Sequence, residues 1–449
     1  MRHLVVRFIL VALVVVAACG KTKPTMTGRL SGPTALAEFK GCSQNVDPCV
    51  GSEHHLLLIA NSLSNDLRIF DVDASNFFVA PEALFPLTIP VGESPVSLAI
   101  DPLGQYAFVV NAVSQNVSLV DLAMNQLVEV DTDANTTTHA AELDPQSDRA
   151  LAGVSRVGFA LYGDVQPEYI VAPPQDINWD KTKPLKIYVS LLATGQIAVL
   201  SFQYPDKDAG TPQRLDLLEL VTVGGMPSGL ALTKDGSKLF VADEDLDTIY
   251  MIDTTISPMT FVAIGVGGSS RRLALTPDES ALYVIHSQTP DISVVDVATG
   301  TRYAQWYTIC NSTTLGDTIH FGGMPRSVVF VEDDTNALQV TIDAASKSFK
   351  TLAYVSNLNG DVYLVDAVNH CVIDTNTTNT DDYGNVIIDY AVFVPSVLTG
   401  MDDDLISVDF SSTSTDTDRY RIFLLSEGSN AIMEFFPLSL SSTNYLLYQ

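Results

Sequence analysis

Positive charge is scarce in this sequence. Its 449 residues include 24 lysines and arginines against 53 aspartates and glutamates, which gives a net charge of -29 at pH 7. A protein this acidic repels the phosphates of nucleic acids and anionic lipid headgroups, so nucleic acid is not expected among its partners. Charged residues nevertheless make up only 17% of the chain and hydrophobic residues 46%, so a large core is available and a globular protein is expected.

Long apolar runs are also scarce, and the clearest one spans residues 8–18. It is too short for a membrane-spanning helix, which needs about 20 residues. Arg2 and Arg7 precede the run, and small residues followed by Cys19 end it. This order of charge, apolar run and small residues is typical of a signal peptide, which we assign to residues 1–18.

The segment Val16-Ala17-Ala18-Cys19-Gly20 resembles the bacterial lipobox. The resemblance implies that Cys19 becomes the mature N-terminus and carries several acyl chains, palmitate among them, enough for stable anchoring. Gly20 in place of Asp is similar to the default signal for the outer membrane. A bacterial outer-membrane lipoprotein is therefore expected, facing either the periplasm or the exterior. A standard secretory peptide with a chance cysteine is the alternative.

Cysteine is sparse, and four residues remain after Cys19: Cys42, Cys49, Cys310 and Cys371. Export permits disulfides, and an even number is the expected count. One bond would close a small loop near the N-terminus and the other a long loop, with unpaired buried thiols as the alternative for Cys310 and Cys371. The sequence has no CxxC or CxxCH motif, so zinc ribbons, thioredoxin chemistry and covalent haem attachment find no support.

Catalytic fingerprints are missing as well. There is no GxSxG elbow, P-loop, HExxH motif or dinucleotide fingerprint in a workable context. The two tryptophans argue against a carbohydrate platform of stacked indoles. The sequence therefore indicates no particular reaction.

What the chain does contain is a repeat. A short run ending in aromatic-Val-x-polar is followed by a turn and by an alternating strand that usually closes with Asp, and another strand precedes most copies. Val, Ile, Leu and aromatic residues alternating between Gly, Pro, Asn and Asp turns are typical of β-strands. No part of the mature chain shows sustained helical periodicity. Seven copies, two of them degenerate, occupy residues 58–71, 108–121, 188–201, 240–253, 283–296, 354–366 and 423–436.

This pattern resembles the YVTN family of β-propeller repeats, which occurs in bacterial and archaeal surface proteins and in lactonase-like propellers. The resemblance covers residues 53–449 and implies an all-β fold, a seven-bladed β-propeller of four-stranded antiparallel blades. A two-sheet sandwich is the alternative. The first copy lacks an upstream inner strand, so residues 443–449 are expected to complete that blade and close the ring. Residues 19–52, rich in Gly, Pro, Ser and Thr, are expected to form a flexible tether.

Three long insertions are expected on one face of the ring, at residues 129–153, 305–323 and 372–403. Loops this long usually carry function or disorder. Cys310 and Cys371 lie in or beside two of them, on adjacent blades, so a bond between them would pin that face.

Three arginines are candidates for an anion site. Aligning the inner strands places Arg156, Arg271 and Arg326 at one repeat position, where they are expected to converge on the mouth of the central channel. Guanidinium groups form bidentate bonds to carboxylate or phosphate. The alternative is that each arginine pairs with a neighbouring carboxylate, with those of residues 402–404 at hand.

His286 is the candidate acid or base. It occupies the turn position that Asn61, Asn111, Asp243 and Asn357 hold in other copies. Asn and Asp favour such turns because their side chains hydrogen-bond to the local backbone, so a structural role is the default. Imidazole is a poorer turn former and a better proton carrier, which singles out His286.

A polar loop offers hard oxygens for calcium, with Asp374, Asn376, Asp381 and Asp382 as candidate ligands. The spacing does not match an EF-hand. A solvated polar loop is the alternative, and the sequence predicts no other cofactor.

The sequence as a whole favours a monomeric binding or scaffolding propeller that holds a cell-envelope protein or a small ligand through its insertion-rich face. A lactonase-like hydrolase is the alternative, with the three arginines holding an anionic cyclic ester and His286 moving protons. A propeller bearing haem or quinone is a third class, against which the missing haem motif counts.

Overall fold

The computed structural model describes residues 30–42, 53–79, 87–123, 126–127, 156–159, 164–176, 178–206, 209–211, 213–303, 306–307, 309–310, 315–333, 338–358, 361–384, 387–390, 392–393, 405–409, 420–426, 430–435 and 445–448. Regular structure in these ranges is β-strand apart from one 3₁₀ turn, η2 (Leu192–Thr194). A search of the same ranges finds no helix with the length and apolarity needed to cross a membrane.

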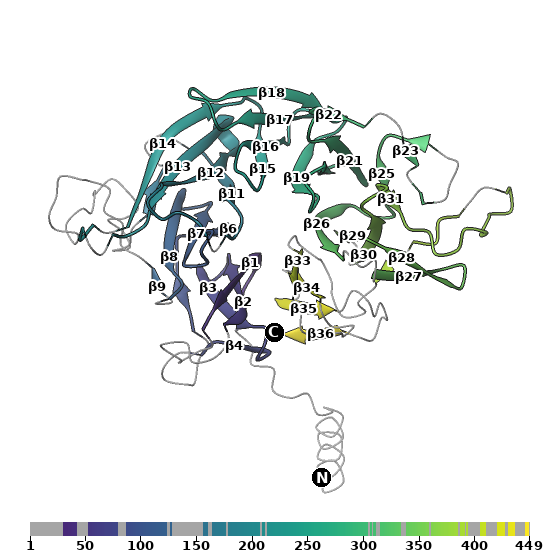
Figure 1. Cartoon of the computed structure of the whole chain (residues 1–449), viewed down its shortest axis with the longest axis horizontal. Helices are drawn as coiled ribbons and strands as arrows, with labels where there is room; N and C mark the ends of the chain where they lie inside the picture. The colour runs from purple at the N-terminus through teal and green to yellow at the C-terminus, as the bar shows by residue number, and fades with distance from the viewer. Residues whose placement is uncertain are drawn as a thin grey trace, which may run out of the picture.

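The strands form antiparallel sheets arranged around a central axis, which we number as blades in chain order (Figure 1). Blade 1 contains β1 (Pro33–Gly41), β2 (His54–Asn61), β3 (Asp66–Asp71) and β4 (Asn76–Phe77), with β5 (Ile89–Pro90) also paired to β3. Blade 2 contains β6 (Pro95–Ile100), β7 (Tyr106–Asn111), β8 (Asn116–Asp121) and β9 (Gln126–Leu127), with β10 (Arg156–Gly158) also paired to β8. Blade 3 contains β11 (Pro167–Val171), β12 (Leu185–Leu191), β13 (Gln196–Gln203) and β14 (Arg214–Thr222).

The remaining sheets continue the ring. Blade 4 contains β15 (Pro227–Leu232), β16 (Lys238–Asp243), β17 (Thr248–Asp253) and β18 (Thr260–Gly265). Blade 5 contains β19 (Ser270–Leu275), β20 (Ala281–His286), β21 (Asp291–Asp296) and β22 (Thr301–Arg302), with β25 (Ile319–His320) on β21. Blade 6 contains β26 (Pro325–Glu332), β29 (Thr351–Asn357), β30 (Val362–Asp366) and β31 (Cys371–Val372), with β32 (Val392–Phe393) on β30. The last sheet contains β33 (Leu405–Asp409), β34 (Tyr420–Ser426), β35 (Ala431–Phe435) and β36 (Tyr445–Tyr448).

Two small hairpins stand apart from these sheets. They pair β23 (Trp306–Tyr307) with β24 (Leu315–Gly316), and β27 (Leu338–Ile342) with β28 (Ala345–Phe349).

The β-propeller class is confirmed, but the expected architecture of seven equivalent four-stranded blades closed by the C-terminal strand is wrong. The structure describes the side chains of the inner strand, and hence of the channel wall, in six blades and not in the last sheet. Four of the six blades have a fifth strand. The C-terminal strand β36 pairs with β35 at the outer edge of the last sheet and does not enter blade 1.

The strand that the C-terminus was expected to supply is β1, which comes from the segment expected to be tether. It pairs with β2 from Pro33 opposite Asn61 to Gly41 opposite His54. A tether was expected because of the average composition of this segment. That average does not show the pattern of the strand, in which Ala35 and Phe39 are buried. Its Pro, Thr and Gly residues lie at the strand ends.

Side-chain packing closes the ring. Leu36, Leu57 and Ile59 of blade 1 share a buried cluster with Phe423 and Leu425 of β34. The backbone N–H of Gly32 donates to Asn430 Oδ1 at 2.8 Å across the same seam. The N-terminal and C-terminal sheets therefore join through side chains and lie side by side in Figure 1.

A buried carboxylate links two neighbouring blades. Asp101, directly after β6, is fully buried and its Oδ1 accepts the backbone N–H of Gln105 at 2.6 Å and of Tyr106 at 2.5 Å. Its Oδ2 accepts the Tyr204 hydroxyl of blade 3 at 2.6 Å. Burial raises the pKa of Asp101, while these hydrogen bonds oppose that shift.

We expect Tyr204→Phe to lower the free energy of unfolding by about 1.5–3 kcal/mol, because it removes a hydrogen bond to a buried charged group. Urea unfolding measures the change. Tyr383→Phe is the control, since Tyr383 is 91% exposed and its hydroxyl lies in water. Equal stability of the two variants would show that the contact between Asp101 and Tyr204 does not hold the blades together.

Candidate functional site

The inner strands of the six blades begin in the same way. Each shows a shift in pairing register just after its first residue, a β-bulge or similar irregularity. Such a bulge re-aims the side chains that follow it. The third residues of these strands lie within the irregularity in β11 and β15 and directly after it in the other four strands; they are Ala35, Ser97, Tyr169, Gly229, Arg272 and Ser327.

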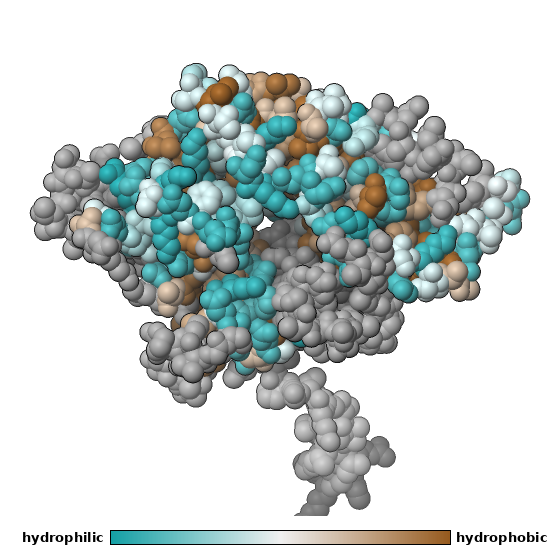
Figure 2. Space-filling view, viewed as in Figure 1, coloured by the Kyte–Doolittle hydropathy of each residue, from teal (hydrophilic) through white to brown (hydrophobic). Residues whose placement is uncertain are grey.

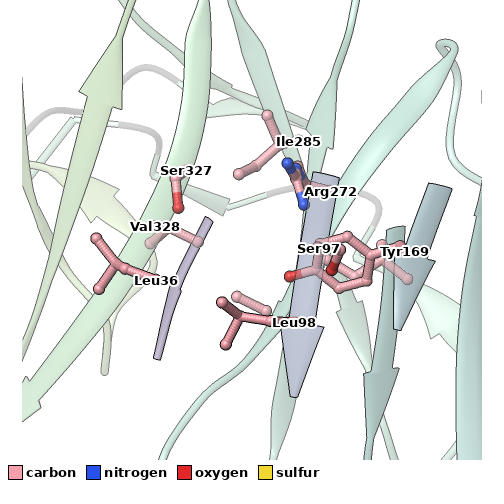
Figure 3. A pocket seen from close by; sticks show the side chains of 10 residues that line it. Leu36, Ser97, Leu98, Tyr169, Arg272, Ile285, Ser327 and Val328 are labelled. Atoms are coloured by element: carbon pink, nitrogen blue, oxygen red, sulfur yellow. The ribbon is translucent and has the colours of Figure 1, made fainter. Parts of the chain in front are cut away.

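A central cavity of about 150 Å³ lies among the inner strands (Figure 3). Most of the surface that lines it is polar, and Ser97, Tyr169, Arg272 and Ser327 supply polar side-chain groups. Among the residues that the structure describes, Arg272 is the only charged one that lines this cavity. The space-filling view shows the hollow at the centre of the ring, bordered by many hydrophilic residues (Figure 2). The apolar lining residues are Leu36, Leu98, Leu273, Ala274, Ile285 and Val328.

Arg272 reaches across blade 4 to blade 3. Its guanidinium carbon lies 4.5 Å from the centre of the Tyr169 ring, a cation–π contact. Gly229 of β15 permits this approach, because a Cβ there would lie 2.3 Å from the Arg271 carbonyl oxygen and 2.9 Å from Arg272 Cα. The Ser228 hydroxyl donates to the same carbonyl at 3.1 Å and fixes β19 against β15.

A carboxylate lies beside the neighbouring arginine. Glu244 Oε1 is 3.8 Å from Arg271 Nε. Burial raises the pKa of Glu244, the charge of Arg271 opposes that shift, and the charge of Glu168 adds to it. Arg271 therefore has a carboxylate partner on the adjacent blade.

The structure separates the three arginines that the sequence grouped. Arg271 and Arg326 occupy the second position of β19 and β26, as the alignment of inner strands implied. Arg156 lies in β10, which pairs with β8 at the outer side of blade 2. Arg272 lines the cavity, and none of these three arginines is among its lining residues. The sequence does show that Arg272 directly follows Arg271. The repeat pattern does not show the bulge, which turns Arg272 and not Arg271 toward the cavity.

His286 lies inside blade 5, 2% exposed, at the end of β20. Its Nε2 is 2.9 Å from Ser293 Oγ, and the Ser293 hydroxyl also lies 2.9 Å from the Val266 carbonyl. A carbonyl only accepts, so the serine proton points to Val266 and His286 donates from Nε2. The residue does not line the cavity. It fills the buried turn position that Asn or Asp fills in other blades.

We expect stability to fall on acidification partly through His286. Burial lowers its pKa below the usual 6.5. Between that lowered pKa and 6.5, this histidine binds more protons in the unfolded chain than in the folded protein. The contribution of neutral His286 to the free energy of unfolding is therefore complete above pH 6.5 and is lost as the pH falls. His286→Asn should therefore show a shallower loss of unfolding free energy down to about pH 5. Urea unfolding across this range measures it, and an unchanged slope would contradict the assignment.

We call the face of the ring at which the inner strands begin the insertion face, after the three insertions that the sequence predicts for it. It also carries the turns that join the second and third strands of each blade. In four of those turns an aliphatic side chain is exposed: Leu63 by 74%, Val113 by 63%, Leu246 by 45% and Leu358 by 46%. The insertion at residues 129–153 lies outside the described residues, and the other two are described in part.

Acidic residues predominate on the described turns of this face, although Arg271 reaches Glu244 and Arg302 reaches Asp317 there. The described turns and strand entries on it, residues 31–34, 61–66, 92–95, 111–116, 164–167, 191–196, 224–227, 243–248, 266–270, 286–291, 315–325 and 356–358, contain no lysine or arginine. Exposed carboxylates on the same turns are Glu93, Asp164, Asp245, Asp247 and Asp317. The turns of the opposite face and the strand ends beside them hold charges of both signs: Lys40, Lys181, Lys183, Lys186, Lys234 and Lys238, and the carboxylates of Asp73, Asp180, Asp235, Asp253, Asp278 and Asp296.

The disulfide between Cys310 and Cys371 is confirmed, with the two sulfurs bonded and the Cα atoms 5.0 Å apart. It joins the insertion at 305–323 to β31 of blade 6. Cys42 is also disulfide-bonded. Cys19 and Cys49 lie outside the described residues.

The calcium candidates have partners of their own. Asp374 Oδ1 accepts the backbone N–H of Asn376 at 3.0 Å and of Asp389 at 3.1 Å. Asp381 Oδ1 accepts the N–H of Tyr383 at 2.9 Å. These side chains thus form local turns, and in the described part of the chain they are not among the His, Cys, Asp and Glu groups spaced for a metal ion.

No protein-family model and no curated protein matches this sequence. The structure is similar to hydrazine synthase of Kuenenia stuttgartiensis, with a TM-score of 0.50, 15% identity, and coverage of 93% of this chain and 99% of that chain. A protein from Lactobacillus plantarum is also similar, with a TM-score of 0.49, 12% identity, and coverage of 92% of this chain and 95% of that chain. The β-propeller domain of Cps50 from Myceliophteria thermophila has a TM-score of 0.46, 10% identity, and coverage of 92% of this chain and 99% of that chain. At such low identity the likeness concerns the β-propeller fold and not an activity.

Proposed function

We propose that this chain is a binding propeller, held at the bacterial outer membrane by a lipid on Cys19, whose insertion face docks a cationic protein of the cell envelope. One observation carries the proposal. Four blades expose an aliphatic side chain at the same turn of the repeat, and all four turns lie on one face.

Single exposed aliphatic residues are ordinary on protein surfaces, but four of them on the same turn of different blades, all on one face, need a reason. The turn itself does not require an aliphatic residue, because blade 5 has the exposed Gln288 two residues after His286. Apolar side chains spread over a face and set among polar residues suit a protein interface.

Charge selects the kind of partner. The exposed carboxylates on the described insertion-face turns attract a cationic protein and speed its association. The same charge disfavours an anionic membrane surface and a second copy of this acidic face.

The proposed anchor supports the same location. Leu30 and Ser31 directly precede β1 at the insertion face, where the Ser31 N–H donates to Asn61 Oδ1 at 3.0 Å. Residues 20–29 separate this point from Cys19 and span at most about 35 Å when fully extended. The N-terminal end of β1 would therefore lie within about 35 Å of the lipid anchor, within reach of other envelope proteins.

We expect a synthetic peptide of alternating lysine and leucine to bind the full chain carrying Cys19→Ser, which cannot be acylated. The combined variant Leu63→Ser, Val113→Ser, Leu246→Ser and Leu358→Ser should weaken its binding at least tenfold, since the apolar contact area is lost. Fluorescence anisotropy of the labelled peptide measures the Kd.

The matched control is Ile256→Ser with Val368→Ser, which removes aliphatic residues 42% and 56% exposed on turns of the opposite face. This control should change the Kd less than twofold. A lysine–serine peptide of equal charge should bind more weakly than the lysine–leucine peptide. Equal weakening by both sets of variants, or none by either, would overturn the proposal.

A further inference from the structure

The outer edge of blade 4 differs from the outer edges of most other blades. In blades 1, 2, 5 and 6 this edge is divided between two short strands, because the fourth and the fifth strand each pair with only part of the third. Of the six blades whose inner strands are described in full, only blades 3 and 4 end in one continuous strand. Short edge strands offer little backbone for pairing, so blades 3 and 4 are the ones that a further strand could extend.

The edge strand of blade 3 is protected against such pairing. Leu218 of β14 lies at a shift in pairing register with β13, a β-bulge or similar irregularity. The same strand carries Arg214, Asp216 and Glu219. Bulges and charged side chains both disfavour the addition of a further strand.

The edge strand of blade 4, β18, has neither protection. Its residues pair with β17 along the whole strand without a shift in register. Residues 254–270, which contain the strand, include no charged residue. In an edge strand, alternate residues direct their backbone N–H and C=O groups away from the sheet. β18 therefore presents a regular, uncharged backbone edge to the outside of the ring.

Apolar side chains accompany this open edge. Phe261 is 41% exposed and Val262 57% exposed, and Ala263 between them and the strand end is exposed as well. The Phe261 ring packs edge-on against Tyr250 of β17, with the ring centres 5.3 Å apart, which fixes its position. β18 runs along the outer rim of the ring (Figure 1), and hydrophobic side chains show at this part of the rim (Figure 2).

A second copy of this chain suits the edge. The open backbone groups call for an extended strand, and the lack of charge selects neither a cationic nor an anionic one. Copies of a chain with a net charge of -29 repel each other, but residues 254–270 bring no charge to a contact between them. β18 is also complementary to itself. In an antiparallel pair centred on Val262, each Phe261 lies opposite the small Ala263 of the second copy.

We infer that two copies of this chain associate through β18, as an antiparallel strand pair about a two-fold axis at Val262. Each copy has one such edge, so the pairing closes at a dimer. A contact limited to one strand and its flanks is smaller than the roughly 1,200 Å² of stable complexes, so the dimer is expected to be weak. The site lies on the rim and not on the insertion face, so it is independent of the docking proposed above.

Sedimentation equilibrium of the full chain carrying Cys19→Ser tests the dimer. The average mass should rise from one copy toward two between about 10 µM and about 1 mM, as a small interface implies. Val262→Lys should raise the dimer Kd at least tenfold, because a charge on an edge strand opposes pairing. Val368→Lys is the matched control, since Val368 is 56% exposed on a turn of the opposite face, and it should leave the Kd within twofold.

A symmetric disulfide tests the register. Residues directly opposite each other in an antiparallel pair have Cα atoms about 4.5–5.5 Å apart, which a disulfide can span. Val262→Cys should therefore form a covalent dimer on mild oxidation. Ala263→Cys should form much less, because its two copies would lie opposite Phe261 and not opposite each other. Val368→Cys is the control for random collision.

Several outcomes would overturn the inference: a single copy at all these concentrations, species larger than a dimer, equal effects of Val262→Lys and Val368→Lys, or equal crosslinking of the three cysteine variants. Thermal unfolding of each variant checks that it is folded. The combined serine variant of the insertion face should dimerise as the parent chain does, and Val262→Lys should still bind the lysine–leucine peptide. These two results keep this inference and the proposed docking separate.

Discussion

The inner strands must fit around a single axis, and the rest of the structure depends on that fit. Each inner strand packs against its neighbours on both sides, so its polar side chains can bond across to the next blade. The Thr34 hydroxyl donates to the Pro95 carbonyl at 2.7 Å between blades 1 and 2, and the Ser228 hydroxyl donates to Arg271 between blades 4 and 5. Where the approach is closest, a glycine is needed, as at position 229. The ring is thus a set of side-chain contacts between sheets and not one continuous sheet.

The same constraint builds the cavity. The bulge near the start of each inner strand turns the third residue of most of these strands toward the axis, so residues remote in sequence line one small space. One of these positions holds arginine and one holds tyrosine, and the missing side chain at Gly229 lets them meet. The chemistry of the channel therefore depends on three adjacent blades together. A change in any one of them would alter it.

Repetition made the fold predictable. The recurring aromatic-Val-x-polar runs located the second and third strands of each blade, and the buried asparagines at positions 61, 111 and 357 confirm that this polar position is structural.

Two other features could not be predicted from the repeat pattern. β1 departs from the repeat and sits in a stretch with the composition of a linker, which led to the wrong strand for ring closure. The bulges shift the channel wall by one residue, so Arg271 was chosen where Arg272 lines the cavity. His286 differs from its repeat neighbours in chemistry but shares their burial, and hydrogen bonding with Ser293 decides its role.

The position of β1 also connects the proposed lipid anchor with the stability of the ring. This strand is the inner wall of blade 1, part of the seam with the last sheet, and the first described strand after the proposed lipid. A mechanical load on the lipid end would therefore reach the seam before any other part of the ring. Peeling β1 away from β2 would expose the wall of Leu57, Ile59 and Phe423 and open the ring at its one junction between chain ends. Under tension this protein would fail first at its attachment, and a partner bound across the insertion face would act as a brace that spans the gap.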